Sequence, residues 1–333
     1  ILFQGDSAGP IPHVTLAAEA DAILIAPASA DCLARLAHGL ADDIVSCTTM
    51  SFQGPLMVAP AMHENMYLSA ATQANIALLR ERGAVIIGPE SGELASGGRG
   101  AGRMSPIETV VGWTLKTLGH SGDLAGRTVV VTAGGTQEPI DPVRCVTNHS
   151  SGKMGYALVE AARDRGAYVI LVTAPTALRA PAGVEVVHVT TAQDMYEATQ
   201  AAVKHADALI MAAAVADYRP ANPRQDKIKK ERASLELSLE RTVDILGSLE
   251  GPFVRVGFAA ESSDLEKNAQ TKLAEKRLHL IVANDITATD SGFGSESNRV
   301  TLIDRNGTVD QLPLLSKREV ADQVLDRVIR LLA

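Results

Sequence analysis

Residues 127–155 read RTVVVTAGGTQEPIDPVRCVTNHSSGKMG, and this stretch decides how the second half of the chain folds. It opens with apolar and β-branched residues at 128–132, which predict a buried strand, and then turns through Gly134 and Gly135. A strand, a glycine turn and a later helix are typical of a nucleotide site. The glycines let the backbone approach a phosphate, and a helix beginning near Ser150 would add unpaired N–H donors.

A long polar segment, 137–151, separates the glycine turn from that helix. A plain dinucleotide fold would need only a few residues there, so the insertion is informative. Arg144 can hold a phosphate or a carboxylate, and Asn148 can hydrogen-bond a polar intermediate. The alternative is a solvated surface loop, but so many donors directly after a Gly-Gly turn favour a binding site.

Strand and helix patterns alternate on both sides of this stretch, which predicts open, mostly parallel sheets covered by helices. We therefore expect an α/β protein of two Rossmann-like three-layer domains. The expected boundaries are a first domain at 1–118, a linker at 119–126 and a second domain at 127–333. The glycine-rich segment 91–103 predicts a mobile clamp rather than a regular element.

The expected elements follow from runs of apolar residues and from helical periodicity. Strands are expected at 21–27, 84–88, 168–173, 184–189 and 280–285, and a strand followed by a turn is expected within 55–63 and within 254–261. Helices are expected at 32–41, 64–82, 107–118, 156–165, 265–276 and 318–332.

Composition narrows the function classes. The 333 residues are 46% hydrophobic, which is enough for two cores of ordinary size. The net charge of −8 gives no general basic surface for nucleic acid or an anionic membrane. No apolar run reaches the ~18 residues that predict a membrane span. Three cysteines without a paired or metal-ligand spacing fit a reducing cytoplasm.

Two later stretches carry further candidates for the site. Residues 207–218 predict a strand, a turn of small residues and then Asp217, whose carboxylate can accept from a nucleotide or hold Mg²⁺. Lys227 begins the run KIKK, and mobile cations of this kind suit a polyanionic transition state. A solvated lysine turn is the alternative for KIKK.

The chain resembles the bifunctional coenzyme A biosynthesis flavoproteins. These combine phosphopantothenoylcysteine decarboxylase with phosphopantothenate–cysteine ligase. The resemblance rests on VTAGGTQEPIDPVR, TNHSSGKMG, AAAVADYRP and KIKK, and it covers nearly the whole chain. It implies a flavodoxin-like flavin domain before about residue 118 and a ligase domain after it.

The resemblance also implies the chemistry of the ligase half. CTP and Mg²⁺ would activate the carboxylate of 4′-phosphopantothenate as an acyl-cytidylate with release of pyrophosphate, and the cysteine amine would then displace CMP. Catalytic roles fall to Asn148, Arg144 and Lys227, and Asp217 is also the candidate metal ligand. The implied nucleotide-binding residues are Gly134, Gly135, Met211, Ala212, Ala213, Asp217, Lys227, Asp244, Ile245, Leu246, Phe258, Lys272 and Lys276.

In the flavin half, the resemblance places FMN against Pro27, Ala28 and Ser29. FMN would serve to oxidise the cysteine thiol, release CO₂ and reduce the product to 4′-phosphopantetheine. Two marker positions differ from the family: His63 stands where an Asn binds the substrate carboxylate, and Ser96 where a Cys supplies a proton. His63 can still donate a hydrogen bond, or it can cap a helix. The family's first strand, helix and second strand, with a catalytic His, are absent from this sequence.

The family further implies a homo-oligomer, with dimers formed by ligase halves and trimers formed by flavin halves. Three other functions stay open on the sequence. One is a ligase with a silent flavin half, and a second is a non-catalytic flavoprotein scaffold. The third is a nicotinamide-dependent oxidoreductase, against which the lack of G-x-G-x-x-G after either strand argues.

Overall fold

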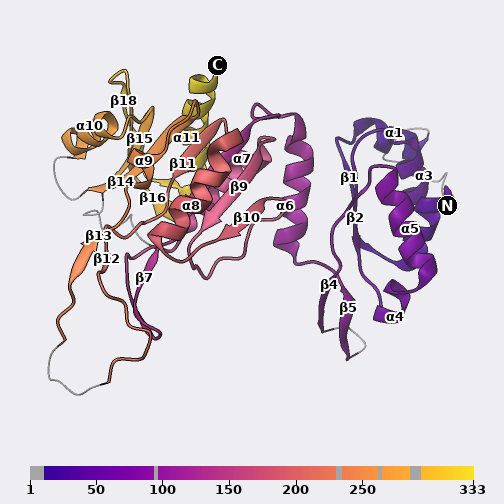
Figure 1. Cartoon of the computed structure of the whole chain (residues 1–333). Helices are drawn as coiled ribbons and strands as arrows, with labels where there is room; N and C mark the ends of the chain where they lie inside the picture. The colour runs from indigo at the N-terminus through magenta and orange to yellow at the C-terminus, as the bar shows by residue number, and fades with distance from the viewer. Residues whose placement is uncertain (1–10, 94–96, 230–234, 262–264, 286–293) are drawn as a thin grey trace. The chain divides into compact units, whose positions relative to one another are not determined.

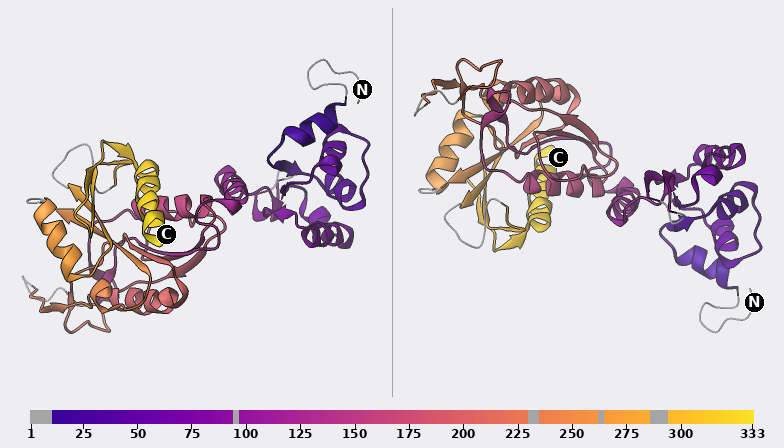
Figure 2. Two further views of the ribbon diagram at one scale, coloured as in Figure 1. Left: turned by 90° about the horizontal axis from the view of Figure 1, so that it is seen from above. Right: turned by 90° about the horizontal axis from the view of Figure 1, so that it is seen from below.

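The computed structural model describes residues 11–93, 97–229, 235–261, 265–285 and 294–333. The chain divides into two compact units, Ile1–Leu118 and Gly119–Ala333, which we call unit 1 and unit 2. Figures 1 and 2 draw both units. None of the helices in the described ranges is long and apolar enough to cross a bilayer.

Unit 1 is built on a three-stranded parallel sheet in the order β1-β2-β3. Neighbouring residues of β2 point to opposite faces, so Val58 packs with Leu33 and Ile76 while Met57 and Ala59 pack on the other side. Helices therefore cover both faces of the sheet, as a three-layer fold requires. The elements are α1 (Pro12–Glu19), β1 (Ile23–Ala28), α2 (Ala30–His38), α3 (Ile44–Ser51), β2 (Leu56–Pro60), α4 (Glu64–Tyr67), α5 (Ala70–Glu81), β3 (Val85–Ile86), β4 (Glu90–Glu93), β5 (Arg99–Arg103) and α6 (Ile107–Leu118).

Two expectations for unit 1 are wrong in detail. The helix expected at 64–82 is broken into α4 and α5, because Ser69 accepts a hydrogen bond from Thr72 N–H and so begins a new helix. The glycine-rich segment expected to be irregular contains an antiparallel hairpin, β4 with β5. Gly102, at φ +141°, lets that hairpin lie against the backbone of Met62.

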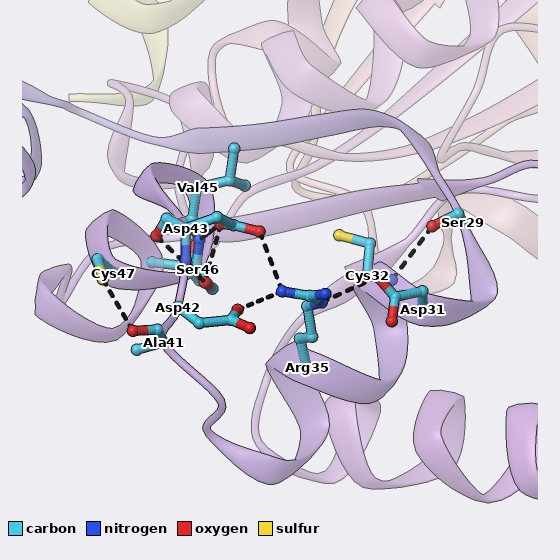
Figure 3. Close-up of polar contacts among 11 residues, drawn as sticks. Ser29, Asp31, Cys32, Arg35, Ala41, Asp42, Asp43, Val45, Ser46 and Cys47 are labelled. Atoms are coloured by element: carbon cyan, nitrogen blue, oxygen red, sulfur yellow. Dashed lines mark hydrogen bonds and ion pairs between the residues drawn. The ribbon is translucent and has the colours of Figure 1, made fainter. Parts of the chain in front are cut away.

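Helix α3 was not expected, and polar contacts place it. Arg35 on α2 donates to Asp31 at 2.8 Å and also binds Asp42 in the following loop (Figure 3). Asp43 then accepts from Ser46 N–H at 2.7 Å in a capping box that begins α3. These contacts join two helices through an acidic loop, a pattern without an apolar signature in the sequence.

Unit 2 contains an eight-stranded sheet in the order β10-β9-β6-β11-β14-β15-β17-β18. The strands from β10 to β15 are parallel, and β17 and β18 return antiparallel. The strands are β6 (Thr128–Ala133), β9 (Tyr168–Thr173), β10 (Glu185–His188), β11 (Ala208–Met211), β14 (Val254–Glu261), β15 (Leu280–Asp285), β17 (Val300–Asp304) and β18 (Val309–Gln311).

Five helices cover both faces of this sheet (Figure 2). They are α7 (Lys153–Asp164), α8 (Ala192–Ala202), α9 (Ile245–Ser248), α10 (Leu265–Glu275) and α11 (Lys317–Leu332). Val129 and Val131 of β6 pack with α7 and α11, whereas Val130 packs on the opposite face with α8 and α9. The predicted class, a three-layer α/β fold with a mostly parallel sheet, is confirmed.

Three small antiparallel pairs lie outside the large sheet. The segment expected as a loop at 137–151 contains one of them, β7 (Gln137–Asp141) with β8 (Arg144–Thr147). A second, β12 (Tyr218–Pro220) with β13 (Leu239–Arg241), contacts β7, and Figure 1 shows both at one end of unit 2. The third joins β16 (Ser297–Asn298) to β19 (Leu315–Ser316).

The segment 119–126, expected as a linker, is packed on unit 2. It begins with a 3-10 helix at Gly119–Ser121, and Leu124 has no exposed area. Leu124 N–H donates to the carbonyl of Arg165 at 3.0 Å. The Arg165 guanidinium also binds Asp123 at 2.6 Å and Asp326 at 2.7 Å. This segment is therefore part of the second core rather than a free tether.

Candidate functional site

The order of the strands places a switch point in unit 2 between β6 and β11. From β6 the chain continues to β9 and β10 on one side, and it then returns through β11 to β14 and β15 on the other. The loops after β6 and β11 consequently diverge at the carboxyl edge of the sheet, which is where open α/β sheets bind ligands. The two loops still meet through the Gly135–Ala214 bridge.

The close contact between these two loops requires glycine at positions 134 and 135. Gly134 has φ +80°, its carbonyl accepts from Ala214 N–H at 2.8 Å, and a Cβ there would lie 2.8 Å from the Ala174 carbonyl oxygen. A Cβ on Gly135 would lie 2.7 Å from the Asn148 carbonyl oxygen. Neither glycine lines the two cavities described below, so the structure gives them a packing role.

The larger cavity, of about 560 Å³, lies beside the ends of β11 and β14. Nine of the thirteen residues that the resemblance assigned to the nucleotide line it, and they come from four separate segments of the chain. These nine are Met211, Ala213, Asp217, Asp244, Ile245, Leu246, Phe258, Lys272 and Lys276. The sequence reasoning did not single out Val215, Tyr218, Arg241, Thr242, Val243, Gly257, Leu278 and Ile281, which line it too.

The smaller cavity, of about 460 Å³, lies at the start of α7. The predicted Ala212 and Asn148 line it, together with 149–155 and with side chains from distant parts of the chain. Ala213, Val215, Asp217, Phe258 and Lys272 line both cavities. The two cavities therefore share a wall that carries one carboxylate and one ammonium group.

Asp244 and Lys276 form an ion pair at the larger cavity, with Nζ 3.0 Å from Oδ1. The same carboxylate accepts from Gly247 N–H at 3.2 Å and so caps α9, which orients Ile245 and Leu246. Lys272, one turn before Lys276, reaches the shared wall instead. The Asp244 carboxylate therefore holds Lys276 beside the larger cavity.

Asn148 lies at the mouth of the smaller cavity. Its Nδ2 donates to the carbonyl oxygen of Val215 at 3.0 Å, across the switch point. The preceding Thr147 donates from Oγ1 to the Thr136 carbonyl at 2.8 Å. These bonds hold the end of β8 between the loops after β6 and β11, so the Asn148 side chain is positioned although it is exposed.

Arg144 and Lys227 do not line either cavity. Arg144 donates to Asp141 at 2.6 Å and to the carbonyl of Ile228 at 2.8 Å. Burial alone would raise the pKa of Asp141, but hydrogen bonds from Val143 and Ile228 N–H groups and from Arg144 hold that pKa at about 2. This contact attaches the loop that carries Lys227 to the hairpin of β7 and β8.

In unit 1 the predicted flavin contacts lie at the end of β1, where Pro27 and Ala28 are its last two residues and Ser29 follows. Pro27 and Ser29 are exposed, whereas Ala28 has no exposed area and belongs to the core. Ser29 Oγ accepts from Cys32 N–H at 3.2 Å and begins α2 (Figure 3). Pro27 and Ser29 therefore fit a flat ring or phosphate at this edge, and the Ala28 side chain does not.

His63 caps helix α4, which is one of the two roles that the sequence left open. Its Nδ1 accepts from Asn65 N–H at 3.2 Å at the start of α4. The adjacent Glu64 carboxylate accepts from Ala101 N–H at 3.0 Å and so holds the hairpin of β4 and β5 against this loop. Ser96, the other altered position, lies outside the described residues.

The described residues contain no group of three or more His, Cys, Asp and Glu side chains that could hold a metal ion. Asp217 is exposed and stands where the two cavities meet. A single carboxylate fits Mg²⁺, which usually keeps several waters and takes its other ligands from substrate phosphates.

Several residues of the smaller cavity were missed because their segments are distant in the chain. Asn284 is the second-last residue of β15, Asn298 lies on β16 and Lys317 begins α11. The polar end of the 280–285 strand was a usable signal for Asn284. Nothing local marks Asn298 or Lys317, because the antiparallel return of the chain after β15 brings them to the cavity.

The fold defines the class of protein, an α/β protein of two units whose second unit has two cavities at the switch point of a mostly parallel sheet. Residues 124–332 match the family described as DNA/pantothenate metabolism flavoprotein C-terminal domain, and residues 4–119 match the family Flavoprotein. The coenzyme A biosynthesis bifunctional protein CoaBC of Bacillus subtilis is 42% identical over 335 residues, which cover 99% of this chain and 82% of that protein. The chain belongs to the family of bifunctional coenzyme A biosynthesis proteins.

Other relatives agree with this assignment. The CoaBC protein of Escherichia coli is 41% identical over 325 residues, which cover 95% of this chain and 80% of that protein. A crystal structure of the C-terminal domain of a CoaBC protein is 44% identical with a TM-score of 0.55, and the match covers 64% of this chain and 98% of that one. The DNA/pantothenate metabolism flavoprotein from Streptococcus pneumoniae matches with 26% identity and a TM-score of 0.53, covering 62% of this chain and 99% of that one.

Proposed function

We propose that unit 2 joins 4′-phosphopantothenate to cysteine with CTP and Mg²⁺, and that unit 1 decarboxylates the product with FMN. The chain is an enzyme of coenzyme A biosynthesis with ligase and decarboxylase activities, as its family membership establishes. The nucleotide, the metal and the roles of individual residues are our proposal. The observation that carries it is the convergence of nine predicted residues from four segments on the larger cavity.

In the first step, a carboxylate oxygen of 4′-phosphopantothenate attacks the α-phosphorus of CTP, and the bond to the departing pyrophosphate breaks. Lys272 and Lys276 supply positive charge where negative charge develops on the leaving group. Asp217, on the wall that both cavities share, is the residue that would hold Mg²⁺. The shared wall lets the nucleotide occupy one cavity while part of its partner substrate occupies the other.

In the second step, the cysteine amine attacks the acyl carbon and CMP departs. No protein nucleophile is needed, because both steps are displacements by a substrate group. Asn148, fixed by its bond to the Val215 carbonyl, would hydrogen-bond the acyl phosphate and orient it. Its rigid attachment at the switch point supports a positioning role in both steps.

Lys227 acts in this proposal through motion of its loop. The Asp141 contact holds Ile228 beside the hairpin of β7 and β8, so the lysine reaches a cavity only when that loop shifts or when it completes the site of a second copy. Closing with substrate would bring a cation to the triphosphate at the moment of reaction.

For unit 1, bound FMN would supply the oxidation and reduction that decarboxylation requires. Pro27 and Ser29 would border the flavin, and the α2 N-terminus would lie beside it. His63 would keep its Nδ1 in the α4 cap and present its other ring nitrogen to the substrate carboxylate.

We also propose that the chain forms homo-oligomers, with dimers through unit 2. Exposed apolar side chains on and around its two hairpins support this: Val143 is 60% exposed, Tyr218 47% and Leu239 45%. By light scattering, a Leu239→Glu variant should have at most half the mass of the parent assembly; an unchanged mass contradicts this interface. The trimer of flavin halves stays a prediction.

The experiment for the ligase is pyrophosphate release from 4′-phosphopantothenate, CTP, Mg²⁺ and cysteine, with CO₂ followed in the same reaction. Asn148→Ala and Lys227→Gln should each lose most of the pyrophosphate signal. Lys204→Gln, an exposed lysine in the Val203–His205 turn outside both cavities, is the matched control. CO₂ alongside pyrophosphate would show an active flavin half, and pyrophosphate without CO₂ would leave only the ligase. Folded protein that releases no pyrophosphate with any nucleoside triphosphate would contradict the proposal.

A further inference from the structure

Two buried threonines, Thr132 and Thr136, flank the glycine turn after β6. Neither has any exposed area. A hydroxyl group that is buried in a protein costs free energy unless it is hydrogen-bonded. Both hydroxyl groups bond to the backbone of the loop after β11, which carries residues of both cavities. Since neither threonine lines a cavity itself, each can affect the site only through that loop.

Thr132 holds the start of the loop after β11. Its Oγ1 accepts from the N–H of Ala213 at 3.2 Å and donates to the Met211 sulfur at 3.5 Å. Met211 and Ala213 both line the larger cavity. The start of the loop is therefore fixed against β6, and other contacts must set the position of its end.

Thr136 holds the end of the same loop. Its Oγ1 accepts from the N–H of Ala216 at 2.9 Å, and its own N–H donates to the Ala214 carbonyl oxygen at 3.3 Å. Ala216 is only 2% exposed, so water cannot replace the hydroxyl as the acceptor. Ala216 directly precedes Asp217, which lies on the wall that the two cavities share. The Thr136 hydroxyl therefore determines where Asp217 leaves the loop.

Thr242 completes the hold on Ala216 from another segment. Its Oγ1 donates to the Ala216 carbonyl oxygen at 2.6 Å, and its N–H donates to the Asp217 carbonyl oxygen at 3.0 Å. Both backbone polar groups of Ala216 are thus bonded, the N–H to Thr136 and the carbonyl to Thr242. Loss of the Thr136 bond would leave the backbone before Asp217 held at one side only.

The carbonyl oxygen of Thr136 holds a second part of the site. It accepts from Thr147 Oγ1 at 2.8 Å. Thr147 directly precedes Asn148, whose Nδ2 donates to the Val215 carbonyl oxygen in the loop after β11. Thr136 therefore bonds through separate atoms to the segment that carries Asp217 and to the segment that carries Asn148.

We propose that Thr136 is a positioning residue of the ligase, which holds Asp217 and Asn148 at a fixed separation across the switch point. The inference rests on the proposed function, in which Asp217 holds Mg²⁺ and Asn148 orients the acyl phosphate. Both residues act on the same reacting phosphate, so a small change in their separation weakens catalysis. Thr136 touches no substrate and acts through these two residues.

Thr136→Val removes the hydroxyl group and keeps a side chain of similar size. The Ala216 N–H is then buried without its acceptor, so the backbone before Asp217 shifts. The kcat for pyrophosphate release should fall about tenfold or more, and the Mg²⁺ concentration that gives half the maximal rate should rise about tenfold. A smaller fraction of folded enzyme would lower the rate without changing that Mg²⁺ concentration. Thr136→Ser keeps the hydroxyl and should keep most of the activity.

Thr199→Val is the matched control. Thr199 on α8 also has no exposed area, but its Oγ1 has no hydrogen-bond partner within the part of the chain that the structure describes. It lines neither cavity. The same change from hydroxyl to methyl should therefore leave kcat and the Mg²⁺ requirement unchanged. Circular dichroism with a thermal melt shows which variants are folded.

Hydrogen exchange followed by mass spectrometry tests the contact without any turnover. In the substrate-free chain, Thr136→Val should speed amide exchange within residues 212–217, whereas Thr199→Val should not. This measurement separates the inference from the proposed function. A parent chain that releases no pyrophosphate with any nucleoside triphosphate contradicts the proposed function, and the exchange rates then still show whether Thr136 holds this loop.

Thr147→Val is a second variant that keeps the inference testable if Thr136→Val does not fold. Position 147 is exposed, so this substitution leaves the core unchanged. It removes the bond to the Thr136 carbonyl and should lower kcat about threefold to tenfold, because Asn148 is held less firmly. A folded Thr136→Val chain with the kcat and Mg²⁺ requirement of the parent overturns the inference. If that chain does not fold, an unchanged kcat in Thr147→Val overturns it.

Discussion

The carboxylate of Asp141 accepts a hydrogen bond from the backbone N–H of Ile228 at 3.1 Å, although 87 positions separate the two residues. Asp141 lies at the end of β7, and Ile228 directly follows Lys227. Arg144 reinforces the contact by binding both the Asp141 carboxylate and the Ile228 carbonyl. The position of the lysine loop is therefore set by the hairpin that carries Arg144 and leads directly into Asn148.

Replacing Asp141 with Asn should release this loop. Asn cannot pair with Arg144 as a charge, so trypsin should cleave after Lys227 or Lys229 faster, and ligase turnover should fall by about threefold to tenfold. Asp226→Asn is the matched control, since Asp226 is exposed in the same loop. Equal cleavage and turnover in the two variants would show that the contact does not control the loop.

The same carboxylate should give a specific pH dependence. Its pKa in the folded protein is held at about 2, below the value of about 3.9 expected for an unfolded Asp. Its contribution to stability is then complete above the unfolded pKa and is lost as the pH falls from about 4 towards 2. Urea unfolding of the parent and of Asp141→Asn should differ most near pH 6 and converge below pH 4. A constant difference over that range would refute the assignment.

Lys276 should affect nucleotide affinity more than stability. Its pair with Asp244 is partly exposed, with side chains 35% and 52% accessible, so loss of the pair should change the free energy of unfolding little. Lys276→Met should nevertheless raise KM for CTP about tenfold or more, because it removes a cation and leaves the Asp244 charge beside the phosphates.

The double variant separates these two effects of Lys276. Adding Asp244→Asn to Lys276→Met should restore part of the CTP affinity, because the unpaired carboxylate is gone. No recovery in the double variant would show that repulsion by Asp244 is not involved.

The sequence predicts the large elements of the fold because their signals are local. Helix Ile107–Leu118 and strands Tyr168–Thr173 and Leu280–Asp285 have the expected bounds, since each is an apolar run or stripe ended by polar or small residues. The hairpin of β7 and β8 was missed, because its short strands are polar and Asp141 is fixed by a residue far along the chain.

The same distinction applies to the candidate site, where some residues were predicted and others were not. Apart from Asp217, the predicted residues that line the larger cavity were named from the family resemblance and not from the pattern of strands and helices. The pairing of Asp244 with Lys276 could not be foreseen from spacing, since it depends on how α9 and α10 pack. Lys317 and Asn298 depend on the antiparallel strands that follow β15, and neither lies in a recognisable motif.

Gly155 should matter for packing rather than for phosphate binding. It lies on α7 where the helix crosses β6, and an added Cβ would lie 2.6 Å from the Cβ of Ala133 and 3.1 Å from the Thr132 carbonyl oxygen. Both neighbours are in the core, with Ala133 fully buried, so neither can move aside cheaply. Gly155→Ala should therefore lower the free energy of unfolding by about 1–3 kcal/mol.

Gly98→Ala, where a Cβ meets nothing within 4 Å, is the control and should change the free energy of unfolding little. Urea denaturation followed by circular dichroism measures both. A Gly155→Ala variant as stable as the parent would mean that α7 can move away from β6, and the start of α7 would then be a less rigid wall for the smaller cavity.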